Sequence, residues 1–131
     1  MKRWTMATVE RTYGFRATHH LPGAASKRAR TPHNHIYNVT VFYKHEVNGR
    51  FGWTKDFWEV DEIMRPIVES FEGADLNLYL KVPTSELVCC MILNELPGWV
   101  DGVSVRENSQ SKVTVARRDF NPKWWSEHGP K

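Results

Sequence analysis

Cysteine is scarce in this sequence: two of the 131 residues are cysteines, and they are the adjacent pair Cys89 and Cys90. Neighbours on a helix point about 100° apart, so these two thiols cannot readily bridge to each other. A framework of disulfide bonds is therefore excluded. We expect a protein of a reducing compartment, the cytoplasm.

Long hydrophobic runs are also missing. No stretch approaches about 18 consecutive apolar residues, the length that a membrane-spanning helix needs. The first five residues lead into no apolar segment of the kind found in secretion signals. We therefore expect no membrane partner.

A strong excess of one charge is absent as well. The net charge is +3 and the isoelectric point is near 9.0, which favours an anionic ligand only mildly. Nucleic-acid binding through residues 27–30 and the pair Trp124-Trp125 is an alternative. No recognised nucleic-acid-binding module accompanies these residues, so we expect no such partner.

The overall amino-acid composition is typical of a globular protein. Hydrophobic residues make up 40% and charged residues 25% of the chain, so disorder is not expected. At this length we expect one domain over residues 1–131, with a basic and aromatic tail over residues 118–131.

Apolar residues that recur at every second position indicate strands. Five segments follow this pattern: residues 8–19, 33–47, 50–54, 102–107 and 112–117. Between the second and third of them, Asn48-Gly49 predicts a hairpin turn, because both residues tolerate positive φ.

Apolar residues spaced by three and four positions predict a helix that begins after Asp56 and ends at Gly73. Asp56 is expected to be the N-cap, and Glu59 completes a capping box with it. Pro66 lies inside this helix and should cost about 3 kcal/mol relative to alanine, or kink the helix.

A second helix is predicted over residues 83–96, and it is apolar almost continuously from Leu87 to Leu93. These elements predict an α+β fold, with an antiparallel sheet and two helices on one face. A helix this apolar leaves hydrophobic surface that a monomer would expose. We therefore expect a closed homo-oligomer.

Three histidines are the strongest candidates for a functional site. His33 and His35 are two residues apart at the start of a predicted strand, so both imidazoles point to the same face. His19 ends another predicted strand on a matching face. Three imidazoles with one vacant position describe a catalytic zinc site, where water or substrate completes the coordination. We therefore expect one Zn²⁺ on His19, His33 and His35.

These histidines belong to a longer series of motifs, in which x is any residue. The series is Phe15-x-Ala17-x-His19-x-Leu21, His33-x-His35-x-Tyr37, Gly52-Trp53-Thr54-Lys55-Asp56-Phe57, Leu76-Asn77, Pro83-Thr84-Ser85-Glu86 and Val105-Arg106-Glu107. In this order, over residues 15–117, the motifs resemble the family of 6-pyruvoyl-tetrahydropterin synthase and 6-carboxytetrahydropterin synthase.

The resemblance implies the tunnelling fold, an α+β fold in which a four-stranded antiparallel sheet carries two helices on one face. Subunits with this fold pool their sheets into a barrel and bind substrate at their interfaces. A homohexamer or a trimer is then expected. The resemblance also implies zinc on the three histidines and a pterin ring held by Glu107. That role is chemically reasonable, because a carboxylate accepts two parallel N–H bonds from a 2-amino-4-oxo heterocycle.

The sequence departs from the family pattern at the residues that transfer protons. Ala29 stands where the family has its catalytic cysteine, and the family's Asp-His pair falls on Glu72 and Gly73. Alanine and glycine carry no group that can move a proton. Two smaller departures replace a glycine and a threonine of the family: Asn34 and Asn108.

Glu72 keeps a carboxylate, and we expect it to be the catalytic base. The alternatives are His20, Asp75 and the basic residues 27–30, which could hold a phosphate or a carboxylate. The two cysteines lie in the apolar helix and are expected to be inert core thiols.

The chain is thus identified as a divergent member of this family. We expect a zinc-dependent lyase or cyclase that acts on a pterin or a pterin-like heterocycle with non-standard catalytic residues. Retro-aldol cleavage of a dihydropterin side chain is one reaction that the resemblance allows. The alternatives are a catalytically altered module that binds zinc and a pterin, and an enzyme with a non-pterin substrate in a specialised biosynthetic pathway.

Overall fold

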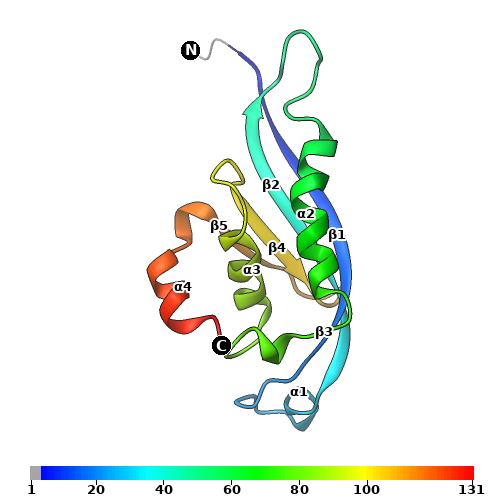
Figure 1. The fold of residues 1–131 in the computed structure, drawn as a ribbon, viewed down its shortest axis with the longest axis vertical. Helices are drawn as coiled ribbons and strands as arrows, with labels where there is room; N and C mark the ends of the chain where they lie inside the picture. Colours follow the sequence, from blue (N-terminus) through cyan, green and yellow to red (C-terminus); the bar gives the residue numbers. More distant parts are fainter. Residues whose placement is uncertain (1–3) are drawn as a thin grey trace.

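The structure is a computed structural model that describes residues 4–131. Two long strands, β1 (Met6–His19) and β2 (His33–Glu46), form the spine of a sheet, and α2 and α3 lie on one side of it (Figure 1). The other elements, in chain order, are α1 (Lys27–Arg30), α2 (Phe57–Phe71), β3 (Ala74–Asp75), the 3-10 helix η1 (Leu76–Leu78), α3 (Ser85–Asn94), β4 (Gly102–Arg106), β5 (Val113–Ala116), the 3-10 helix η2 (Arg117–Asp119) and α4 (Pro122–His128).

Within the described residues, the sheet has five strands in the order β3-β1-β2-β4-β5. β1 and β2 pair antiparallel along their whole length, from Met6 opposite Glu46 to His19 opposite His33. The predicted α+β class is confirmed. The expected sheet was antiparallel with four strands, but the observed sheet is mixed, because a fifth strand, the two-residue β3, runs parallel to the end of β1.

Side chains alternate between the two faces of β1 and β2, because neighbouring residues of a strand point to opposite sides. The odd-numbered residues face the helices and form much of the core: Phe15, Ala17, His19, Tyr37, Val39, Val41 and Tyr43. On the opposite face, the hydroxyls of Thr12 and Thr40 lie 2.8 Å apart. The register pairs odd residues with odd residues, so His19, His33 and His35 all point to the covered face.

The predicted strand over residues 50–54 is wrong, since these residues form part of a loop. The partners of β2 are β1 and β4 instead. The loop closes on itself, because the Asn48 N–H donates to the Trp53 carbonyl at 2.8 Å. Its positive φ, 79°, is at Gly52 rather than at Gly49. Asn48-Gly49 therefore begins a longer loop and does not form a two-residue hairpin turn.

The first predicted helix is confirmed as α2. Asp56 is its N-cap, but its side chain accepts from the Trp58 N–H at 2.9 Å, and the Glu59 N–H donates to the Asp56 backbone carbonyl at 3.0 Å, so the predicted capping box does not form. Pro66 lies inside the helix on its exposed side. Gly73, with φ of 74°, lets the chain leave the helix.

The second predicted helix is confirmed as α3, which is shorter than predicted and begins after its N-cap, Thr84. Two short helices, α1 and α4, were not predicted. For α4 the sequence carried a signal, because Asn121-Pro122 combines a good N-cap with proline in the first turn. None of the described helices is long and apolar enough to cross a membrane.

A buried carboxylate fastens α2 to β1. Asp61 of α2 accepts two hydrogen bonds from the Arg11 guanidinium, at 2.7 and 2.9 Å, and a third from the Tyr13 hydroxyl at 2.6 Å. These hydrogen bonds favour the charged carboxylate, and those from Arg11 have the largest effect. They hold the pKa of Asp61 well below its ordinary value.

Because this pKa is lowered on folding, Asp61 contributes stability above the ordinary carboxyl pKa of about 3.9 and loses it as the pH falls further. We expect Asp61→Asn to lower the free energy of unfolding near pH 7, and we expect the difference from the wild type to shrink near pH 3. Urea unfolding at both pH values measures this. Glu62→Gln, an exposed neighbour in α2, is the control. An Asp61→Asn effect of equal size at both pH values would contradict the assignment.

Candidate metal centre

The three predicted metal ligands lie together at one end of the long strands. The register places His19 directly opposite His33, and His35 follows on the same face. One ring nitrogen from each histidine lies within 4.8 Å of the others. Among residues 4–131, no other group of three or more histidine, cysteine or acidic side chains has ligand atoms this close together.

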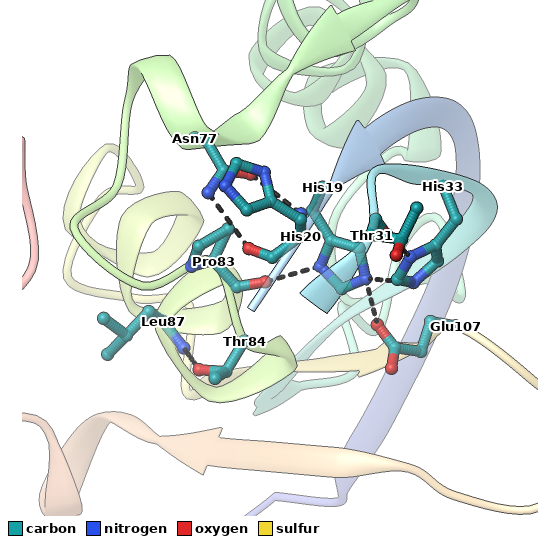
Figure 2. Close-up of polar contacts among 9 residues, drawn as sticks. All are labelled: His19, His20, Thr31, His33, Asn77, Pro83, Thr84, Leu87 and Glu107. Atoms are coloured by element: carbon teal, nitrogen blue, oxygen red, sulfur yellow. Dashed lines mark hydrogen bonds and ion pairs between the residues drawn. The ribbon is translucent and has the colours of Figure 1, made fainter. Parts of the chain in front are cut away.

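Backbone carbonyls orient two of the three rings. Nδ1 of His19 lies 2.8 Å from the Pro83 carbonyl oxygen, and Nδ1 of His33 lies 2.7 Å from the Thr31 carbonyl oxygen (Figure 2). A carbonyl oxygen only accepts, so both Nδ1 atoms donate, and in the neutral rings the lone pairs are on Nε2. Proteins orient histidine ligands toward a metal in this way.

These two lone pairs face each other. Nε2 of His19 and Nε2 of His33 are 3.0 Å apart. Two acceptors at this distance repel each other unless a proton or a cation lies between them. Two nitrogen ligands of a tetrahedral zinc ion, each about 2.0–2.1 Å from it, are about 3.3 Å apart. The observed spacing therefore fits a metal ion with little movement of the strands.

His35 completes the triad. Its ring centroid lies 4.9 Å from that of His19 and 4.7 Å from that of His33, with the rings edge to face. Burial lowers the pKa of His35, and the neighbouring rings and Arg28 lower it further, against the raising effect of Glu107. The lowered pKa keeps the imidazole neutral near neutral pH, which is the form that binds a metal.

Glu107 directly follows β4, and its carboxylate points toward the triad (Figure 2). Its Oε2 lies 3.9 Å from Nε2 of His19. This oxygen is buried and has no hydrogen-bond partner among the described residues. Leaving a buried acceptor unsatisfied is unfavourable, so a group that donates to Oε2 would be bound favourably here.

A cavity of about 230 Å³ lies against His19 and Glu107. Its other walls come from the loop after β1, the N-cap and first turn of α3, the β4–β5 turn and the start of β5: Leu21, Thr84, Ser85, Glu86, Asn108, Ser111 and Val113. Glu86 brings a second carboxylate to this cavity. The sequence had placed Glu86 in a recognised motif, but no role had been assigned to it.

The structure does not bring Glu72 to the triad of its own chain. Its Oε2 accepts from the backbone N–H of Arg16 at 2.9 Å, at the outer edge of β1. Arg16 precedes His19 by three residues, which is about 10 Å along a strand. Gly73 lies beside it and donates its N–H to the Arg16 carbonyl at 2.7 Å.

Two of the alternative proton carriers have structural contacts. Asp75 accepts from the Asn77 N–H at 3.0 Å. Asn77 in turn holds the backbone of His20, accepting from its N–H at 2.9 Å and donating to its carbonyl at 3.0 Å. Burial raises the pKa of the Cys89 thiol to about 12, so the expectation of an inert thiol is supported.

Ala29 lies in α1, where its carbonyl accepts from the Leu21 N–H at 2.8 Å. Arg30 fastens the same loop by donating to the carbonyls of Ala24 and Ala25, at 3.0 and 2.8 Å. A groove of about 380 Å³ beside this helix runs along Lys27, Arg28, Thr31, Pro32 and His33. The basic residues thus border the triad, on the side of His33.

The sequence matches one protein family and resembles a protein named for the same kind of activity. Residues 8–119 match the model of the family described as 6-pyruvoyl tetrahydropterin synthase. An Archaeoglobus fulgidus protein that bears the provisional name 6-carboxy-5,6,7,8-tetrahydropterin synthase is 32% identical over 113 residues, which are 84% of this chain and 85% of that protein.

Solved structures share the fold. The 6-pyruvoyl tetrahydropterin synthase of Caenorhabditis elegans superposes with a TM-score of 0.77 at 21% identity, over 88% of this chain and 99% of that one. The Plasmodium vivax enzyme superposes with a TM-score of 0.69 at 19% identity, over 86% of this chain and 98% of that one.

Proposed function

The chain belongs to the 6-pyruvoyl tetrahydropterin synthase family, and we propose that it is a zinc-dependent lyase or cyclase that acts on a pterin or a pterin-like heterocycle with non-standard catalytic residues. One observation carries this proposal. The Nε2 atoms of His19 and His33 face each other at 3.0 Å, next to a buried and unpartnered oxygen of Glu107. A site for a cation and a site for an N–H donor therefore lie side by side.

His19, His33 and His35 are the proposed ligands of Zn²⁺. The bound ion would polarise an oxygen of the substrate as a Lewis acid. The chain itself contributes the direction of the ligands, because the carbonyls of Pro83 and Thr31 hold two of the rings with Nε2 turned inward.

Glu107 is the proposed anchor for the heterocycle. A 2-amino-4-oxo ring presents two parallel N–H groups, and a carboxylate accepts both in the geometry of charge-assisted pairing. Oε2 of Glu107 faces His19, so a ring held there would extend toward the triad.

Calorimetric titration with a pterin tests this substrate class. Wild-type protein should bind, and Glu107→Gln should bind about 10- to 100-fold more weakly, because a hydrogen bond to a charged group contributes about 1.5–3 kcal/mol. Glu46→Gln, at the exposed end of β2, is the matched control and should bind like the wild type. Absence of binding by the wild type, or unchanged affinity in Glu107→Gln, would point to a non-pterin substrate.

Glu72 is the proposed catalytic base, and its position requires a second copy of the chain. Within one chain its carboxylate lies at the outer edge of β1, away from the triad. In the described part of the chain this edge is covered by the two-residue β3 alone, and β5 pairs with β4 alone. Both edges of the sheet are therefore open to another subunit, whose triad Glu72 would reach.

We accordingly propose a homotrimer or a homohexamer in which sheets join edge to edge. Large exposed side chains at the β2–α2 loop and the start of α2 add apolar surface that association would cover: Phe51, Trp53, Phe57 and Trp58. Light scattering should give a mass of three or six times 15.3 kDa. A monomer at micromolar concentration would defeat both the assembly and the role of Glu72.

A catalytically altered module that binds zinc and a pterin is the second candidate. It is favoured by one observation, that Ala29 and Gly73 carry no group able to transfer a proton. Tight pterin binding without turnover of dihydroneopterin-type substrates would select this function. The two cysteines are free and buried, which favours the cytoplasm as the location in either case.

A further inference from the structure

All but the first two residues of the C-terminal tail, that is residues 120–131, lie beyond the residues that match the family model, yet this segment is built into the fold. Trp125 of α4 is 6% exposed and packs in the hydrophobic core. Asn121 caps α4 by accepting the N–H groups of Lys123 and Trp124, at 3.0 and 3.1 Å. The tail therefore has a defined place on the body of the protein.

The end of the tail pairs with residues 79–81, in the chain that joins β3 to α3 (Figure 1). Two backbone hydrogen bonds and one antiparallel bridge make this contact: Lys81 N–H to the Gly129 carbonyl at 3.0 Å, Lys131 N–H to the Tyr79 carbonyl at 2.9 Å, and Leu80 opposite Pro130. The Lys81 ammonium also donates to the Glu127 carbonyl at 2.9 Å.

On either side of residues 79–81, the chain contacts His19 or its neighbour His20. On one side Asn77, which is 8% exposed, makes two hydrogen bonds to the backbone of His20. On the other side the Pro83 carbonyl accepts the Nδ1–H of His19 at 2.8 Å (Figure 2). The tail contacts lie between these two points, within two residues of each.

We propose that the C-terminal tail is a positioning element for the metal ligand His19. By holding residues 79–81, the tail sets the place of the Pro83 carbonyl, and this carbonyl sets the direction of Nε2. The inference rests on the proposed metal centre. Loss of a partner that orients a ligand typically lowers metal affinity about 10- to 100-fold, so a displaced tail should be measurable in zinc binding alone.

Gly129→Ala in the full chain tests this inference. A methyl group at Gly129 would overlap the ring of Trp125, so the tail must shift. We expect the dissociation constant for Zn²⁺, measured by competition with a chelator, to rise about 10-fold. The visible absorption of the Co²⁺-substituted protein should change as well, because it reports the geometry of the ligands. Gly98→Ala, whose added methyl meets nothing within 4 Å, is the matched control and should behave like the wild type.

Lys131→Pro is a second, milder variant, which removes the N–H that donates to the Tyr79 carbonyl, together with an exposed side chain. We expect it to weaken zinc binding by a smaller factor while the fold is kept. Thermal unfolding of the metal-free variants separates the two effects. A lower melting temperature with unchanged zinc affinity and an unchanged Co²⁺ spectrum would show a purely structural tail and overturn the proposal. No zinc binding by the wild type would instead overturn the metal centre itself.

Discussion

Replacing both His33 and His35 by alanine is expected to reduce the zinc content of the purified protein from about one ion per chain to nearly none. His19 alone would remain, and a single imidazole cannot hold zinc against dialysis, because structural and catalytic sites need three or four protein ligands. Inductively coupled plasma mass spectrometry on dialysed protein measures the content directly.

The matched control removes a histidine elsewhere. His45, near the end of β2, lies outside the triad and outside the C-terminal tail, so His45→Ala should keep the metal. Full occupancy in the His33→Ala, His35→Ala variant would falsify the metal centre. Loss of metal in the control as well would indicate a general effect on folding rather than the loss of ligands.

Glu72→Gln is expected to lower turnover about 100-fold, because one general acid–base group contributes typically about 10²- to 10⁴-fold. The amide oxygen of glutamine still accepts the Arg16 N–H that the carboxylate accepts at 2.9 Å, so the junction between α2 and β1 should be kept. Turnover is measured with 7,8-dihydroneopterin, alongside zinc content and assembly mass, which should not change.

Glu69→Gln, an exposed residue in the last turn of α2, is the control for the Glu72 prediction. A mixing experiment tests whether Glu72 serves a neighbouring subunit. Chains with Glu72→Gln and chains with His33→Ala and His35→Ala are each impaired alone. Co-assembled, they should recover part of the activity, because some sites then combine an intact triad with an intact Glu72. No recovery in verified mixed assemblies would contradict a shared site.

We expect ordinary synthase turnover of dihydroneopterin triphosphate to be nearly undetectable in the wild type, because acid–base groups of the family are missing. Ala29 and Gly73 stand where the family has two proton-transfer groups, and each such loss typically costs about 10²- to 10⁴-fold. Robust turnover would show that the catalytic residues have been misplaced.

The sequence by itself determined the α+β class, the long strands and the three histidines that meet at one end of them. The reason is that these features depend on side-chain type and periodicity. Two-residue spacing alone puts His33 and His35 on one face, and the helical spacing of apolar residues marks α2 whatever surrounds it. The hairpin over residues 50–54 was wrong because both edges of β2 pair with other strands: β1, which precedes it, and β4, which is far away in the sequence.

Only the tertiary structure decided what surrounds these residues. The rings of His19 and His33 are turned inward by the backbone carbonyls of Pro83 and Thr31. Every residue carries a backbone carbonyl, so the residue types at these positions do not predict the contacts. The same is true of the Arg16 N–H that holds Glu72 away from the triad of its own chain, and of the pairing between the tail and residues 79–81. Long-range backbone hydrogen bonds use groups common to the whole chain, and their partners are selected by packing.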